Sequence, residues 1–258
     1  MQLKQLKPMY KSKKETQEII NKLVDDKEYY GKFGKQFLSN SDIYSLLNSP
    51  KEFRATKPDN KAFAEGRYFH VSLLEPEKKD DIVILDCSSR NTKSYKEQIA
   101  ELGIECALLN HEANHMEAAV ETMRSNMDFF NLMYAEGNKF EVPSIGIIKG
   151  EYFKGKADIE GLDCLIDLKT TSNINDFKWS AKKYNYDSQA YIYQQLFGKP
   201  LIFLVIDKLS FNLGVFRPTE SFIRGGEEKV EKALDVYRTF YADDATEDIH
   251  SYYVDQEL

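Results

Sequence analysis

The sequence has 258 residues, of which 42% are hydrophobic, 13% aromatic and 30% charged. This is enough apolar material for a substantial core and excludes a miniprotein held together by disulfides or metal. The 35 Lys and Arg against 42 Asp and Glu give a net charge of −7, so any nucleic-acid-binding surface must be local. No apolar run approaches the roughly 18–20 residues of a membrane span, and the basic N-terminus lacks the apolar stretch of a signal peptide. We expect no contact with a membrane.

Three cysteines, Cys87, Cys106 and Cys164, are spread irregularly along the chain. Their odd number and wide spacing match neither a disulfide framework nor a CxxC metal site. We therefore expect reduced thiols, which are typical of the cytoplasm.

Periodicity and capping residues predict the secondary structure in chain order. Helices are expected over 15–28, 39–47, 62–74, 187–197 and 220–241, with two more within 94–136. Strands are expected over 82–85, 140–149, 152–159, 164–168, 201–206 and 213–216. This order predicts an α/β (α+β) fold in which a mixed central sheet is flanked by helices. We divide the chain into a basic N-terminal arm (1–38), a main domain (39–241) and an acidic C-terminal tail (242–258).

Two aspartates and a lysine are gathered in the segment GKADIEGLDCLIDLKTT. Asp167 and Lys169 stand two residues apart on a predicted strand, so both side chains leave the same face. If Gly161 and Leu162 form a two-residue hairpin turn, Asp158 becomes a diagonal neighbour of Asp167, roughly 7–8 Å away at the backbone. A three-residue loop would reverse this parity.

Such a cluster suits metal-assisted chemistry. Two carboxylates on one face repel each other unless a hard cation joins them, and oxygen ligands suit Mg²⁺ or Mn²⁺. A neighbouring ammonium can steady an attacking water or the charge on a phosphoryl oxygen. The alternative is a surface hairpin with a solvated Asp–Lys ion pair, which the apolar neighbours Leu165, Ile166 and Leu168 disfavour.

Two further helices carry residues that could join this cluster. Gln189 and Tyr193 lie four residues apart on a predicted helix and share a face. His70, in the segment GRYFH, could add a nitrogen ligand to an oxygen-rich metal site. Taken singly, each is more simply read as a packing or surface residue.

Together these motifs resemble those of PDDEXK-type nucleases of the RecB-like branch, most closely the exonuclease VIII (RecE-like) group of phages and prophages. The resemblance covers about 38–216. The matching elements, in the family's order, are Ser39-x-Ser41 with Ser49-Pro50-x-x-Phe53, Gly66-x-x-x-His70, Glu151 before Lys156-Ala157-Asp158, Asp167-x-Lys169, and Gln189-x-x-x-Tyr193.

The resemblance implies a metal site and its ligands. His70, Asp158 and Asp167 would hold one or two Mg²⁺ or Mn²⁺ ions, with the backbone carbonyl of Leu168 as a further ligand. Lys169 would be the catalytic cation. No iron–sulfur cluster is expected, because Ser49 stands where some relatives have a cysteine.

The resemblance also suggests supporting residues. Gln189 and Tyr193 would line the site or hold the DNA strand. Glu151 matches the family's glutamate, but strand alternation puts it on the opposite face from Asp158 unless a bulge intervenes. Lys156 shares the face of Asp158 and could hold a phosphate. Further candidate contacts to nucleic acid are Arg67, Arg90, Lys93, Lys96, Lys178, Lys182 and Lys183.

The function implied is an exonuclease that resects linear double-stranded DNA 5′→3′ and leaves a 3′ overhang for a single-strand annealing partner. Members of this group form rings around the duplex, and we expect such a homo-oligomer in a bacterial or phage-infected cytoplasm. The alternatives are a structure-specific or single-strand nuclease of the same fold, and a catalytically inactive module for DNA binding or assembly.

A rival motif predicts another activity. His111-Glu112-Ala113-Asn114-His115 is an H-E-x-x-H sequence, which on a helix can bind Zn²⁺ in a metalloprotease. No third ligand is evident, and the motif explains no other feature of the chain. The nuclease interpretation is therefore favoured.

Overall fold

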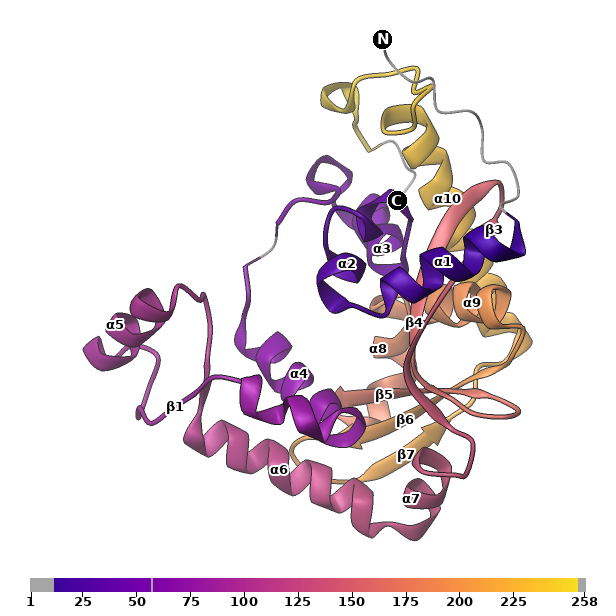
Figure 1. Ribbon diagram of the computed structural model, residues 1–258. Coiled ribbons are helices and arrows are strands. Elements are labelled where there is room, and N and C mark those ends of the chain that lie inside the picture. The colour runs from indigo at the N-terminus through magenta and orange to yellow at the C-terminus, as the bar shows by residue number, and fades with distance from the viewer. Residues whose placement is uncertain (1–11, 57, 255–258) are drawn as a thin grey trace.

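The computed structural model describes residues 12–56 and 58–254 and is built around a five-stranded mixed sheet (Figure 1). The strands follow the order β3-β4-β5-β6-β7, and only β5 and β6 run parallel. Their bounds are β3 Lys139–Ile148, β4 Glu151–Glu160, β5 Leu165–Thr171, β6 Leu201–Asp207 and β7 Leu213–Phe216. The predicted mixed sheet flanked by helices is confirmed.

One face of the sheet is covered by α3 (Asn40–Asn48), α8 (Phe177–Lys183), α9 (Tyr186–Phe197) and α10 (Glu220–Phe240). A parallel pair of strands needs a long crossover, and α8 with α9 supplies it between β5 and β6. Phe153, Phe177 and Phe203 are almost fully buried in this layer. The crossover therefore brings α9 against the strands that carry the acidic cluster.

The other face is covered by α4 (Lys61–Leu74), α6 (Asn110–Ser125) and α7 (Met127–Met133). Its core combines Phe69 of α4 with Met116 and Met123 of α6, all fully buried. Because Phe69 anchors α4, the next residue, His70, is held at the border of this layer.

A small satellite lies beyond this layer. It contains β1 (Ile84–Leu85), α5 (Lys93–Leu102) and β2 (Leu108–Leu109), packed around the buried ring of Tyr95. Short 3₁₀ turns complete the chain: η1 Gly34–Gln36, η2 Pro50–Glu52, η3 Pro76–Asp81, η4 Ile174–Asp176 and η5 Ile249–Ser251. Of the helices in the described ranges, none has the length and apolar character needed to cross a membrane.

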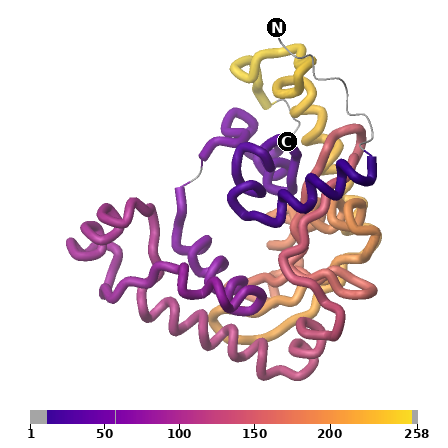
Figure 2. Tube along the Cα trace, viewed as in Figure 1, coloured from indigo at the N-terminus to yellow at the C-terminus, as the bar shows by residue number. Residues whose placement is uncertain are grey.

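The helix predicted over 15–28 is two helices, α1 (Lys13–Leu23) and α2 (Asp26–Tyr30). The side chain of Asp25 accepts from the backbone N–H of Lys27 at 2.8 Å, so it caps α2 and breaks the run. Both helices lie near strands from the middle of the chain, as Figure 2 shows. Leu23 and Tyr29 form a small core with Ile145 of β3. The N-terminal arm, where it is described, is thus packed on the sheet.

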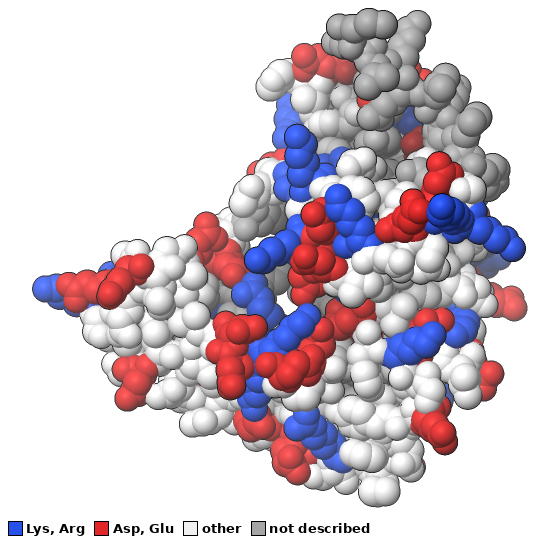
Figure 3. Space-filling view, viewed as in Figure 1, with Lys and Arg blue, Asp and Glu red and all other residues white. Residues whose placement is uncertain are grey.

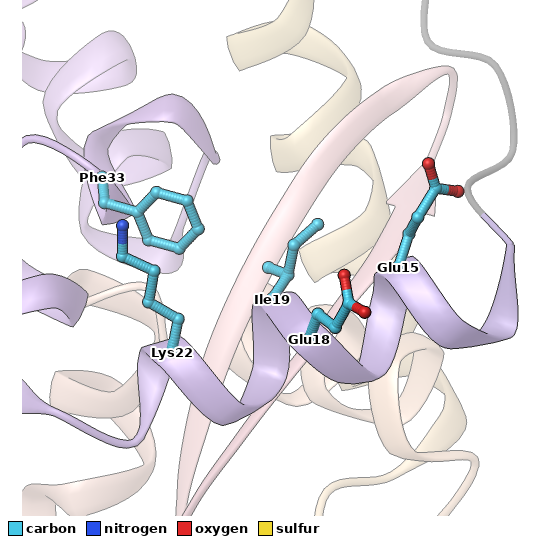
Figure 4. Close-up of a pocket in the computed structure, with 5 residues that line it drawn as sticks. All are labelled: Glu15, Glu18, Ile19, Lys22 and Phe33. Carbon is cyan, nitrogen blue, oxygen red and sulfur yellow. The ribbon is translucent and has the colours of Figure 1, made fainter.

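The surface is hollowed near the middle of the face drawn in Figure 3, and acidic and basic side chains crowd around the hollow. A separate open cavity of about 290 Å³ lies along α1 and is lined by Glu15, Glu18, Ile19, Lys22 and Phe33 (Figure 4). The Lys22 ammonium lies 4.0 Å from the centre of the Phe33 ring. This cavity contains none of the predicted site residues.

Two tight turns set the register of the sheet. Lys149 and Gly150 form a two-residue turn with φ of 52° and 90°, the left-handed conformation that a type I′ hairpin requires. In the next hairpin, Gly161 donates its backbone N–H to the carbonyl of Cys164, so the chain reverses at 162–163. The predicted turn at Gly161 and Leu162 was wrong by one residue. The parity of the two strands is unchanged.

Candidate metal centre and active site

Three carboxylates, Glu141, Asp158 and Asp167, stand in one row across β3, β4 and β5. The register of β3 against β4 pairs the residues on either side of Glu141 with those on either side of Asp158. In the next hairpin Ile159 pairs with Ile166, and the same register continued by one residue places Asp158 opposite Asp167. Glu160 pairs with Leu165 and not, as predicted, with Asp163, so this register favours a directly opposite placement of the two aspartates over the predicted diagonal one.

His70 completes a group of possible metal ligands with two of these carboxylates. Ligand atoms of His70, Glu141 and Asp158 all lie within 4.8 Å of one another, and His70 Nδ1 is 3.3 Å from Asp158 Oδ2. Opposite ligands of a six-coordinate Mg²⁺ are about 4 Å apart. A small closure would let the three side chains share one ion, and their oxygen-rich donor set suits Mg²⁺ or Mn²⁺.

The electrostatics of the carboxylates also fit a cation. Burial and the negative charge of Asp167 raise the pKa of Asp158 to about 6, despite the opposing effect of His70 and Lys169. Burial and the charge of Asp158 raise the pKa of Glu141 to about 8. The protein thus holds these carboxylates together without enough positive charge to balance them, and a divalent cation would supply it.

The backbone of β5 fixes the orientation of Asp158. The Leu168 N–H donates to Asp158 Oδ2 at 2.7 Å, in a buried position. Hydrogen bonds to backbone amides stabilise the charged form of a carboxylate and fix its rotamer. Leu168 therefore contributes its amide to the cluster, while metal binding by its carbonyl stays a prediction.

Asp167 is turned toward Lys169 and Gln189. Its carboxylate forms an ion pair with the Lys169 ammonium, and Gln189 Nε2 donates to Asp167 Oδ1 at 2.5 Å. Only 2% of Asp167 is exposed. The sequence motifs D-x-K and Q-x-x-x-Y thus meet through a direct contact between β5 and α9.

Lys169 is held as a cation. Burial would lower the pKa of its ammonium, but the negative charges nearby, led by Asp167, outweigh it and raise the pKa to about 12. Its Nζ also lies 4.8 Å from the centre of the Tyr186 ring. Since Lys169 keeps its proton near neutral pH, it can donate hydrogen bonds and stabilise negative charge.

Tyr193 forms a hydrogen bond with β4, the strand that carries Asp158. Its hydroxyl donates to the backbone carbonyl of Lys156 at 2.8 Å. Gly155 makes this approach possible, because a Cβ there would meet atoms of Tyr193 and Leu196 at 3.0 Å. Tyr193 therefore contacts β4 from α9 and is placed to position the strand that carries Asp158.

Lys156 lies beside the cluster but is engaged by the N-terminal arm. Its side chain is buried, its ammonium pairs with the carboxylate of Asp26 on α2, and it lies 4.6 Å from the centre of the Tyr29 ring. The ion pairs of Asp26 with Lys156 and Lys78 outweigh the effect of burial and lower the pKa of Asp26. A phosphate would have to compete with Asp26 for Lys156.

Glu151 is not brought into the cluster. It stands at the start of β4, seven residues before Asp158 and so about 20 Å away along an extended strand. Its carboxylate pairs with Arg238 of α10 at 3.1 Å. Among the other predicted contacts, Arg67 pairs with Asp59 at 3.0 Å, whereas Lys178 and Lys182 are exposed on α8.

Sequence reasoning missed Glu141, although a signal for it was present. Lys149-Gly150 is suited to a two-residue hairpin turn, and that turn alone fixes the register that places Glu141 opposite Asp158. At Glu141 the backbone has a φ of 50°, which interrupts the regular strand geometry.

The H-E-x-x-H motif lies on α6, where Glu112 and His115 form contacts that hold the fold together. The Glu112 carboxylate accepts from Arg90 at 2.6 and 2.7 Å and from the Leu109 N–H at 3.0 Å. Burial opposes these contacts, but they lower the pKa of Glu112 to about 2. A carboxylate committed in this way is a poor general base. His115 Nε2 lies 2.6 Å from the carbonyl of Lys208.

Comparison with known proteins supports the fold. A crystal structure from Eubacterium rectale, provisionally described as an exonuclease, aligns with a TM-score of 0.62 and 16% identity, over 91% of this chain and 95% of that one. A second solved structure, described as SSO0001, covers 84% of this chain and 86% of its own at 14% identity, but its TM-score of 0.34 is too low to argue from. No curated protein matches the sequence.

The sequence also matches a family model over residues 36–245, which is most of the chain and includes every member of the acidic cluster. The model is described as a PDDEXK-like domain of unknown function (DUF3799). The chain belongs to this PDDEXK-like family.

Proposed function

We propose that this protein is a metal-dependent deoxyribonuclease that degrades linear double-stranded DNA from its ends in the 5′→3′ direction. The observation that carries the nuclease assignment is the row of Glu141, Asp158 and Asp167 beside His70 and the protonated Lys169. Family membership and the provisional description of the similar E. rectale protein support it. The exonucleolytic mode, the 5′→3′ polarity and a ring-shaped homo-oligomer rest on the resemblance to the RecE-like group.

The residues have separable tasks in this proposal. A divalent cation bound by His70, Glu141 and Asp158 would polarise the scissile phosphate and lower the pKa of a bound water. Lys169 keeps its proton, so its ammonium orients the attacking water and stabilises negative charge on the phosphoryl oxygens. Asp167 pairs with Lys169 and holds it in place, while metal binding by Asp167 itself stays a prediction.

A second group of contacts positions these residues. Gln189 fixes the carboxylate of Asp167, and the Leu168 N–H fixes that of Asp158. These contacts keep the reacting groups in one arrangement before the substrate arrives, which is where much of the rate enhancement of such enzymes originates.

Digestion of a linear duplex labelled at one 5′ end tests the proposal. A circular duplex and a single strand serve as parallel substrates, each with Mg²⁺, Mn²⁺ or EDTA. We expect metal-dependent loss of the linear duplex, early release of the 5′ label and an intact circle. Cleavage of the circle would instead indicate an endonuclease of the same fold. No digestion of any substrate would contradict the nuclease assignment and favour a DNA-binding module.

A further inference from the structure

Two exposed aromatic rings lie on α8, the helix that follows β5, which carries Asp167 and Lys169. Trp179, the only tryptophan of the sequence, is 65% exposed, and Tyr184, which ends the helix, is 49% exposed. The buried residues Phe177 and Ala181 turn the opposite face of α8 to the core. Both rings leave apolar surface in contact with water, which a partner could cover.

Three lysines of α8, Lys178, Lys182 and Lys183, are also exposed. The ammonium of Lys178 lies 5.1 Å from the centre of the Trp179 ring, and that of Lys183 lies 5.8 Å from the Tyr184 ring. Within residues 12–56 and 58–254, no carboxylate forms an ion pair with Lys178, Lys182 or Lys183. The carboxylate of the neighbouring Asp176 accepts from Asn173 at 2.6 Å. Positive charge is thus concentrated here on a chain of net charge −7.

One of the exposed rings, Tyr184, is linked through Tyr186 to the proposed catalytic lysine. The ring of Tyr184 lies 6.2 Å from that of Tyr186, and the Tyr186 ring lies 4.8 Å from Lys169 Nζ. Figure 1 shows α8 beside α9, at the sheet. A strand leaving the metal centre past Lys169 would therefore reach the end of α8 at Tyr184, and Trp179 lies five residues earlier on the same helix.

We propose that Trp179 and Tyr184, with Lys178, Lys182 and Lys183, bind a single strand of DNA by stacking on its unpaired bases while the lysines contact its phosphates. The rings and lysines match the two features of a nucleic-acid strand, its base faces and its backbone charge. A base-paired duplex keeps its bases stacked internally, so it cannot offer them to exposed rings. This inference rests on the proposed nuclease function and identifies where the strand runs.

The single tryptophan provides a direct measurement of binding. Full-length protein in EDTA is titrated with an oligothymidylate while its tryptophan fluorescence is recorded, so that no strand is cleaved. The probes for comparison are a blunt hairpin duplex, an abasic strand of equal length and inorganic polyphosphate. We expect strong quenching by the oligothymidylate and little by the other three. Equal quenching by polyphosphate or by the abasic strand would overturn the stacking proposal.

Variants separate stacking from charge. Anisotropy of a labelled oligothymidylate should show roughly tenfold weaker binding for Trp179→Ala and for Tyr184→Ala, and near-normal binding for Trp179→Phe, which keeps a ring. Phe130→Ala removes an exposed aromatic ring on α7 and is the matched control. Unchanged binding by Trp179→Ala, with its thermal unfolding unchanged, would contradict the proposal.

The outcome also distinguishes this proposal from the nuclease assignment. Metal-dependent cleavage without tryptophan quenching would disprove the strand-binding role of α8 and leave the nuclease intact. Quenching by single strands without cleavage of any DNA would support the surface and contradict the enzyme.

Discussion

Glu141 stands opposite Asp158 on the neighbouring strand, with the ligand atoms of both within 4.8 Å of each other and of His70. By contrast, the glutamate that the sequence motif indicated, Glu151, pairs with Arg238 at the other end of β4. The strand register thus identifies which glutamate can act with the aspartates.

Replacing Glu141 should therefore impair the metal centre. We expect Glu141→Gln to lower metal-dependent DNA cleavage by roughly 100-fold, because one charged ligand of the cation is lost. Glu151→Gln removes the same charge from the same hairpin and is the matched control, expected to stay within about threefold of wild type. Initial rates of duplex digestion compare them. Equal losses in both variants would contradict the assignment.

Gln189 should act by positioning Asp167. We expect Gln189→Ala to lower kcat by roughly 10- to 100-fold, with KM for DNA little changed, because Asp167 and Lys169 would lose their fixed arrangement. Gln195→Ala, exposed on the same helix, is the control. A rise in KM alone would instead indicate that Gln189 contacts DNA directly.

Lys154 should make stability depend on pH. Its side chain is buried, its ammonium donates to the Tyr29 carbonyl, and burial lowers its pKa to about 8. Between pH 8 and about 10 the unfolded chain holds a proton that the folded protein has lost, so this group makes the free energy of unfolding rise with pH. Below pH 8 the folded protein bears the cost of a buried cation.

Comparison with Lys154→Met isolates this effect. From pH 7 to pH 10, we expect wild type to gain stability relative to Lys154→Met by on the order of 2 kcal/mol, as measured by denaturant unfolding. Lys93→Met, on the exposed surface of α5, should show no such change relative to wild type. A difference between wild type and Lys154→Met that is independent of pH would refute the prediction.

Two glycines should respond in opposite ways to alanine. In Gly155→Ala the new Cβ would meet Tyr193 and Leu196 at 3.0 Å, so we expect a loss of about 1–3 kcal/mol in the free energy of unfolding. A Cβ on Gly66, within α4, would meet nothing within 4 Å, so Gly66→Ala should gain up to about 1 kcal/mol. Thermal unfolding of both variants measures these changes in stability. Destabilisation by Gly66→Ala would contradict the prediction that a methyl group fits there without strain.

The sequence predicted the sheet and most of its flanking helices, because periodicity and capping are local properties. The region 94–136, expected to contain two helices, contains α6, α7 and nearly all of α5. The strands expected over 201–206 and 213–216 correspond to β6 and β7, and the helix over 187–197 to α9. Local signals did not predict α8, which has only seven residues and follows a 3₁₀ turn. Such a short helix offers too few turns for periodicity to be recognised.

The site was less predictable, because it depends on contacts between distant parts of the chain. The pair of Asp26 and Lys156 joins residues 130 positions apart, and no pattern in the sequence relates them. The D-x-K segment was recognisable because both residues lie on one strand. Glu141 could be found only by placing the turn at Lys149 and Gly150 first, since register across strands follows from turn geometry.

The central claim is that the acidic cluster and Lys169 cleave DNA with a divalent metal. The most direct measurement compares digestion of a linear duplex by wild type, Asp158→Asn and Lys169→Gln in Mg²⁺, with thermal unfolding as the test of folding. We predict that wild type digests the duplex in Mg²⁺ but not in EDTA, and that both folded variants lose this activity. Digestion in EDTA, or undiminished digestion by either variant, would contradict the account.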